Sequence, residues 1–339
     1  MILRPKPSLR HHGALPGAPA DVAGAMVPGW LRRAILDAQS LAGKEVEDIA
    51  IIAGAAIGAL DAVVRRQERS AGAWRRRLAL AAAATTAKQA GRVEDESALR
   101  DAVLLTRPGD NVGPAGFLLL AWRRLASRPA EDLLTEKNLA AVLDDLGLAR
   151  SDEDVSDLTD DLRQLTASSG TTGMTTGAVA AAERHGLGRW LGPWLVDALL
   201  AQRLGWAHAV PLLGAEPGWS IGRGRPQRFT TVIATAGIET GQERAKGLLA
   251  AQARAALRAI DLSAELERRA DRLLAVAPKL RAKAADAVVE KLLSDDAIVA
   301  SENIAGMSDR GLRRLFDRLV ELGAVRELSG RATFRIYGL

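Results

Sequence analysis

The 339-residue chain contains no cysteine, few aromatic residues (4%) and little lysine. The absence of cysteine excludes disulfide frameworks, thiol catalysis and thiolate zinc sites. Lysine occurs only eight times against 38 arginines, and alanine occurs 64 times. Alanine, leucine and arginine are strong intrinsic helix formers, so this composition favours helices. The hydrophobic fraction of 48% is typical of a soluble globular protein and too high for a disordered one.

Long apolar runs are also missing. The longest nearly uncharged run, Ile49–Leu60, has twelve residues, whereas a bilayer-spanning helix needs about 20. The N-terminal segment, MILRPKPSLRHHGALPGAPADVAGAM, has no continuous apolar region of the kind found in signal peptides. We therefore expect a cytoplasmic protein that does not associate with membranes.

The positive charge is unevenly distributed. A net charge of +5 and a pI of about 9.9 suggest a nucleic-acid partner. Residues 131–162, however, hold eleven acidic residues against only Lys137 and Arg150, a local charge of −9. Taking this segment away from the total leaves +14 on the rest of the chain. The acidic segment 131–162 is therefore a second candidate contact surface, one that would suit another protein.

The spacing of apolar residues predicts an all-α helical body. We expect a flexible arm over 1–28, a helical domain over 29–167, a Ser/Thr/Gly-rich linker over 168–177 and a second helical region over 178–277. Within the first domain, the helix Val46–Arg66 is uncharged between Asp48 and Asp61, which predicts a central buried helix. Its small residues, Gly54 and Gly58 among them, would let a neighbour approach closely. The run Phe229–Thr235 resembles a strand with no obvious partner.

The pattern changes at the C-terminus, over residues 278–339. A helix over Lys283–Leu293 is followed by a turn at 305–307 and by a second helix that begins after Ser308 and ends at Leu322. Two short segments of alternating polarity then flank Gly330, which is typical of a β-hairpin. This order predicts a C-terminal winged helix-turn-helix carrying a small β-hairpin.

Arginines on the last helix indicate contact with double-stranded DNA. Ser308 is the expected N-cap of this helix. With its apolar face buried, the helix would present four arginines to the major groove: Arg310, Arg313, Arg314 and Arg318. Arg331 and Arg335 on the hairpin would contact phosphates. An alternative remains, because Arg313 is four residues from both Asp309 and Asp317 and would suit surface ion pairs. Winged helices also dock proteins, and residues 309–339 carry only +3.

A second polar cluster lies near residue 96. Its members are Arg92, Glu94, Glu96, Arg100 and Asp101. The carboxylates are of the type that binds Mg²⁺, which would fit a metal-dependent enzyme acting on nucleic acid. The alternating charges of Arg92, Glu96 and Arg100 at intervals of four instead predict an ion-pair ladder, and we favour that interpretation. The sequence predicts no catalytic residue, resident metal or cofactor.

Several long runs carry a family resemblance. They are AGAWRRRLALAAAA (71–84), GRVEDESALRDAVLLTRPGDNVGPAGFLLLAWRRLA (91–126), RLGWAHAVPLLG (203–214), LAVAPKLRAKAADAVVEKLLSDDA (274–297) and MSDRGLRRLFDRLVELGAVRELSGRATFRIYGL (307–339). From about Trp30 onward the chain resembles the bacterial family catalogued as domain of unknown function 1403. The resemblance implies a soluble bacterial protein and brings no activity or catalytic residue. The leading hypothesis is a DNA-binding regulator or accessory factor, followed by a metal-dependent enzyme and a non-catalytic docking scaffold.

Overall fold

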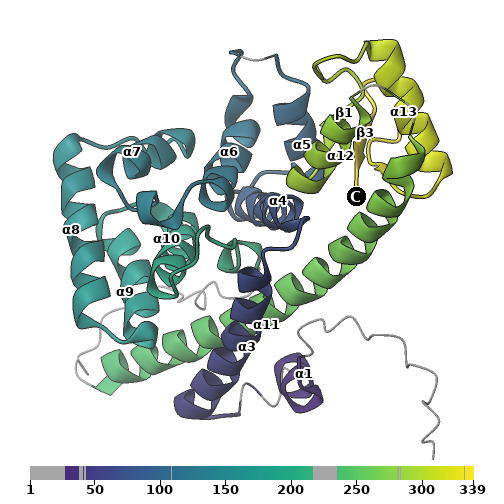
Figure 1. Ribbon diagram of the computed structural model, residues 1–339. Helices are drawn as coiled ribbons and strands as arrows, with labels where there is room; N and C mark the ends of the chain where they lie inside the picture. Colours follow the sequence, from purple (N-terminus) through teal and green to yellow (C-terminus); the bar gives the residue numbers. More distant parts are fainter. Residues whose placement is uncertain are drawn as a thin grey trace, which may run out of the picture.

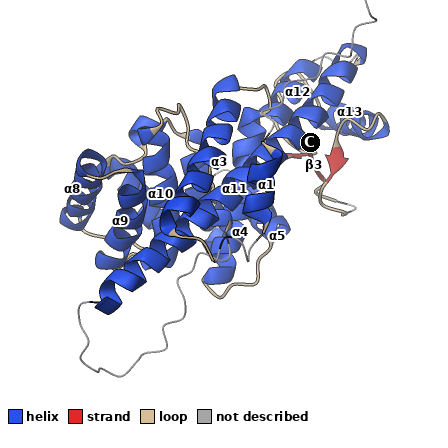
Figure 2. Cartoon of the chain, turned by 90° about the horizontal axis from the view of Figure 1, so that it is seen from below, coloured by secondary structure: helices blue, strands red, loops and turns tan. Residues whose placement is uncertain are grey.

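The described part of the chain is mostly helical, with a small sheet near its C-terminus (Figures 1 and 2). The computed structural model describes residues 27–37, 41, 43–107, 109–216, 235–280, 282, 284–331 and 333–339. The expected arm over 1–28 and the strand-like run Phe229–Thr235 lie almost entirely outside these residues. The all-α body predicted from the apolar spacing is confirmed. Its helices are α1 (Gly29–Leu36), α3 (Val46–Arg66), α4 (Ala71–Gln89), α5 (Glu96–Leu104), α6 (Gly113–Ser127), α7 (Glu136–Asp145), α8 (Asp152–Ser168), α9 (Thr171–Arg184), α10 (Gly188–Arg203) and α11 (Thr235–Val276).

Helix α11 runs diagonally across the molecule and connects its two ends (Figure 1). It has 42 residues, which corresponds to about 63 Å at 1.5 Å per residue. One part packs along α3, and its C-terminal end reaches the sheet-bearing module. No helix in the described part of the chain is both long and apolar enough to cross a membrane.

Helix α4 lies at the centre of the packing. It contacts α5, α6, α11 and α12 (Ala285–Ser294). Small side chains make this possible, since Ala79, Ala82, Ala83 and Ala87 are all fully buried. Trp122 of α6 packs close by and donates a hydrogen bond from Nε1 to the hydroxyl of Thr86 at 3.0 Å. The alanine run of the sequence therefore serves close helix packing.

Helix α3 differs from its prediction as a central buried helix. Ile52 and Leu60 are buried against the rest of the protein, but Ile51 is 66% exposed. Gly54 and Gly58 are exposed as well. The expectation was wrong because, between Asp48 and Asp61, the residues on the outer face of α3 are small or apolar rather than charged, so charge alone did not distinguish the two faces.

The segment 168–177 differs from the linker expected there. Most of it is the first part of α9, which begins at Thr171. The hydroxyls of Thr175 and Thr176 donate to the carbonyl of Thr172, at 2.9 and 3.0 Å, and Met174 is fully buried. Burial of Met174 outweighs the low helix propensity of Thr and Gly, and the threonine hydroxyls find acceptors within the helix. The acidic segment 131–162 contributes α7 and much of α8.

The C-terminal module contains α12, β1 (Ile298–Val299), α13 (Asp309–Glu321), β2 (Arg326–Glu327) and β3 (Ile336–Gly338). The strands form an antiparallel sheet in the order β1-β3-β2, with Tyr337 opposite both Ile298 and Glu327. Strands β2 and β3 form the hairpin that the alternating pattern predicts. The rings of Phe316 and Tyr337 stack with centroids 4.3 Å apart and so fix α13 against β3. In the described residues 300–308, turns rather than a helix join β1 to α13.

Candidate functional site

Helix α13 has one apolar face and one strongly basic face. Leu312, Leu315, Phe316 and Leu319 are buried against the module. The helix begins after Ser308, whose hydroxyl accepts a hydrogen bond from the backbone N–H of Gly311 at 3.2 Å. Ser308 is thus the N-cap that the sequence predicts. Helix α13 lies at one end of the molecule (Figure 1), and its arginines are exposed.

Three arginines on this face have no acidic partner in the described part of the chain. Arg310, Arg313 and Arg314 are exposed, and no acidic side chain of the described residues lies within 4.0 Å of their guanidinium groups. The alternative pairs of Arg313 with Asp309 and with Asp317 do not form. These guanidinium groups are therefore available to an anionic ligand.

The other three predicted contact arginines are held in ion pairs. Arg318 pairs with Glu321 at 3.0 Å on the same helix. Arg335 lies 3.8 Å from Asp317, and at the same distance from Glu327. Arg331 pairs with Asp101 of α5 at 2.5 Å. The hairpin arginines thus fasten the hairpin to α13 and to the helical body.

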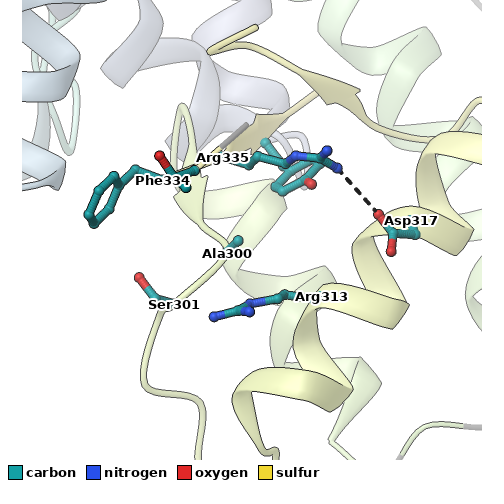
Figure 3. A pocket seen from close by; sticks show the side chains of 8 residues that line it. Ala300, Ser301, Arg313, Asp317, Phe334 and Arg335 are labelled. Atoms are coloured by element: carbon teal, nitrogen blue, oxygen red, sulfur yellow. Dashed lines mark ion pairs between the residues drawn. The ribbon is translucent and has the colours of Figure 1, made fainter. Parts of the chain in front are cut away.

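A groove separates α13 from the hairpin (Figure 3). Its volume is about 380 Å³, and Arg313, Asp317, Phe334 and Arg335 are among its lining residues. Phe334 is 65% exposed and has a φ of +56°, an unusual backbone conformation for a bulky residue. The sequence reasoning missed Phe334, since it counted this residue only as part of the alternation of a strand. An exposed aromatic ring and an unpaired guanidinium therefore line one groove.

A buried ion-pair cluster joins this module to the body. Asp296, between α12 and β1, is 1% exposed. Its Oδ1 accepts from Nη2 of Arg123 on α6 at 2.7 Å, and its Oδ2 accepts from Nε of Arg100 on α5 at 3.3 Å. Arg77 of α4 donates to the backbone carbonyl of Asp296 at 3.0 Å. Burial lowers the pKa of Arg77, and the charge of Asp296 opposes that shift. No local pattern of residues predicts this cluster.

The predicted cluster near residue 96 is divided among separate contacts. Glu94 pairs with Arg92 at 2.5 Å, Arg100 with Asp296, and Asp101 with Arg331. Arg92 lies before α5, whose N-cap is Asp95, so the expected ladder with Glu96 does not form. Glu96 lines a separate surface groove of about 540 Å³. Within the described residues, no group of three or more His, Asp or Glu side chains is placed to hold a metal ion.

Comparison with known proteins gives a family match. A family model described as "Protein of unknown function (DUF1403)" matches residues 20–339. No curated protein and no solved structure matches the chain.

Proposed function

We propose that this chain, which belongs to the DUF1403 family, binds double-stranded DNA as a regulator or accessory factor. The observation that carries the proposal is the set of three exposed arginines, Arg310, Arg313 and Arg314, which have no acidic partner among the described residues. They occupy the first half of α13, and the N-terminal half of a recognition helix is the part that reaches base edges in the major groove.

The arrangement of elements supports a winged helix-turn-helix as the finer description of the module. A helix, a strand, a second helix and a hairpin follow one another, and the strands are ordered β1-β3-β2. In this description α13 is the recognition helix and the β2–β3 hairpin is the wing. The stacking of Phe316 of α13 on Tyr337 of β3 holds the helix against the hairpin.

Arginine chemistry suits the proposed contacts. A guanidinium can donate two parallel hydrogen bonds to O6 and N7 of guanine, or contact a phosphate. Phe334 lines the hairpin side of the same groove as Arg313 and would contact a sugar or base surface there. Arg331 and Arg335, which are paired within the chain, would position the wing instead of providing its main phosphate contacts.

The direct test is a comparison of two triple variants by fluorescence anisotropy with a labelled duplex. Arg310→Ala/Arg313→Ala/Arg314→Ala removes the proposed contacts. Arg69→Ala/Arg128→Ala/Arg163→Ala removes the same charge from exposed positions outside the module. We expect the first variant to lose at least tenfold in affinity and the second to stay within about threefold of the unmodified protein. Equal losses in the two variants, or no loss in the first, would overturn the proposal.

A further inference from the structure

No element in the described part of the chain covers the outer face of α3, and the residues of this face follow a regular order. Its residues recur at intervals of three or four and are all exposed. In chain order they run from an acid through a large apolar residue and three small ones to a base: Glu47, Ile51, Gly54, Gly58, Ala62 and Arg65.

The two glycines make no close contact in the described part of the chain. Glycine is among the least favourable residues in a helix interior. A Cβ added at Gly54 or Gly58 would have nothing within 4 Å, so the described part of the chain does not require glycine there. Gly214 shows the opposite case, because a Cβ there would collide with the ring of Trp122. Close approach of a second helix would require both Gly54 and Gly58.

We infer that this face of α3 binds the same face of a second copy, with the two helices antiparallel about a two-fold axis. The axis would pass between Gly54 and Gly58. A two-fold contact is self-complementary, so a residue i that contacts j implies that j contacts i. With the axis there, Gly54 meets Gly58 of the second copy and Ile51 meets Ala62. The large side chain of Ile51, exposed in one copy, would lie on the small surface at Ala62 of the other.

Charge complementarity supports the antiparallel arrangement. Helix α3 carries Glu47 and Asp48 in its first turn and Arg65 and Arg66 in its last. Antiparallel packing brings Glu47 of each copy to Arg65 of the other, whereas parallel packing would place like charges together. Arg65 is held at the surface by bonds to Asp61 and to the carbonyl of Leu204, both 2.8 Å long, and its side chain is 58% exposed.

The neighbouring helix α1 also exposes large apolar side chains. Helix α1 packs beside α3 and exposes Trp30 (52%) and Leu36 (69%), two of the large apolar side chains that remain exposed among the described residues. The proposed contact does not depend on DNA binding.

The first test is the molar mass of the full chain in solution, measured by sedimentation equilibrium. We expect twice the chain mass of 35.9 kDa at concentrations well above micromolar. Gly54→Leu/Gly58→Leu should be monomeric and yet melt several degrees higher, because leucine favours the helix but keeps two helices apart. Ile51→Arg should also be monomeric. Val93→Arg, at a position 96% exposed outside this face, is the matched control and should remain dimeric.

The second test uses the absence of cysteine to determine the orientation. A mixture of Ile51→Cys and Ala62→Cys proteins should form a disulfide-linked pair on mild oxidation, while each alone should not. A monomeric wild type, a dimer that both α3 variants leave intact, or self-linking of each single-cysteine protein would overturn the inference.

Discussion

Nη2 of Arg123 and Oδ1 of Asp296 lie 2.7 Å apart, although 173 positions separate the two residues in the chain. Asp296 also accepts from Arg100, so two helices of the body share one carboxylate of the C-terminal module. Arg269 of α11 donates to the backbone carbonyl of Leu339 at 2.8 Å and adds a further attachment. The body therefore sets the position in which α13 presents its arginines.

Replacing Asp296 should strongly destabilise the protein. Asp296→Ala leaves Arg100 and Arg123 in the interior without their common counter-charge, and breaking a buried pair costs about 3–5 kcal/mol. Urea unfolding would measure the loss. The control is Asp160→Ala, whose pair with Arg163 is exposed (69% and 65%) and should change the free energy of unfolding by less than about 1 kcal/mol. Similar costs for the two variants would contradict a structural role for the buried cluster.

A buried carboxyl on α10 should make stability depend on pH. Desolvation raises the pKa of Asp197 to about 8, against the opposing hydrogen bonds from the backbone N–H groups of Leu212, Leu213 and Gly214. The folded protein then binds more protons than the unfolded chain between about pH 4 and pH 8, so the free energy of unfolding falls as the pH rises through this window.

Asp197→Asn removes that titration. In thermal melts across the same window, the wild type should lose stability relative to Asp197→Asn as the pH rises. A constant difference between the two proteins over the whole window would show that Asp197 does not titrate there.

Releasing the hairpin from α5 should loosen it without unfolding the protein. Asp101→Asn removes the charge that holds Arg331, whose side chain is 52% exposed. Such a pair contributes about 0–1 kcal/mol, so the melting temperature should hardly change. Amide hydrogen exchange over residues 326–336 should accelerate, while exchange within α4 stays as in the wild type. Unchanged exchange in the hairpin would mean that the pair does not restrain it.

Phe334 should lower the stability of the protein and strengthen its binding to DNA. Because Phe334 has a φ of +56°, Phe334→Gly relieves backbone strain of about 1 kcal/mol and removes an exposed apolar ring. The variant should melt at a slightly higher temperature and bind duplex DNA more weakly than the wild type. A variant that binds as tightly as the wild type would place the ring outside the DNA contact.

Local signals in the sequence predicted much of the C-terminal module. Ser308 and the apolar residues that follow it locate α13, and alternating polarity around Gly330 locates the hairpin. These features depend on neighbours within a few positions, where helix and strand periodicity apply. The exposed arginines on α13 followed directly from that periodicity.

Long-range contacts could not be predicted in the same way. The partners of Asp296 and the pair of Arg331 with Asp101 depend on how helices distant in the chain pack together. The spacing of residues along the sequence does not indicate which distant helices meet. Tertiary burial of Met174 likewise turned the expected linker into a helix. On α3, the lack of charge predicted burial, whereas Gly54 and Gly58 on its outer face are exposed among the described residues.

The central claim is that Arg310, Arg313 and Arg314 bind duplex DNA, and a salt titration tests it most directly. The logarithm of the binding constant for the duplex should fall linearly with the logarithm of the salt concentration, because the protein displaces cations from the phosphates when it binds. The variant Arg310→Ala/Arg313→Ala/Arg314→Ala should have a slope shallower by about two to three. The triple variant at Arg69, Arg128 and Arg163 should keep the wild-type slope. Identical slopes and affinities in all three proteins would contradict the claim.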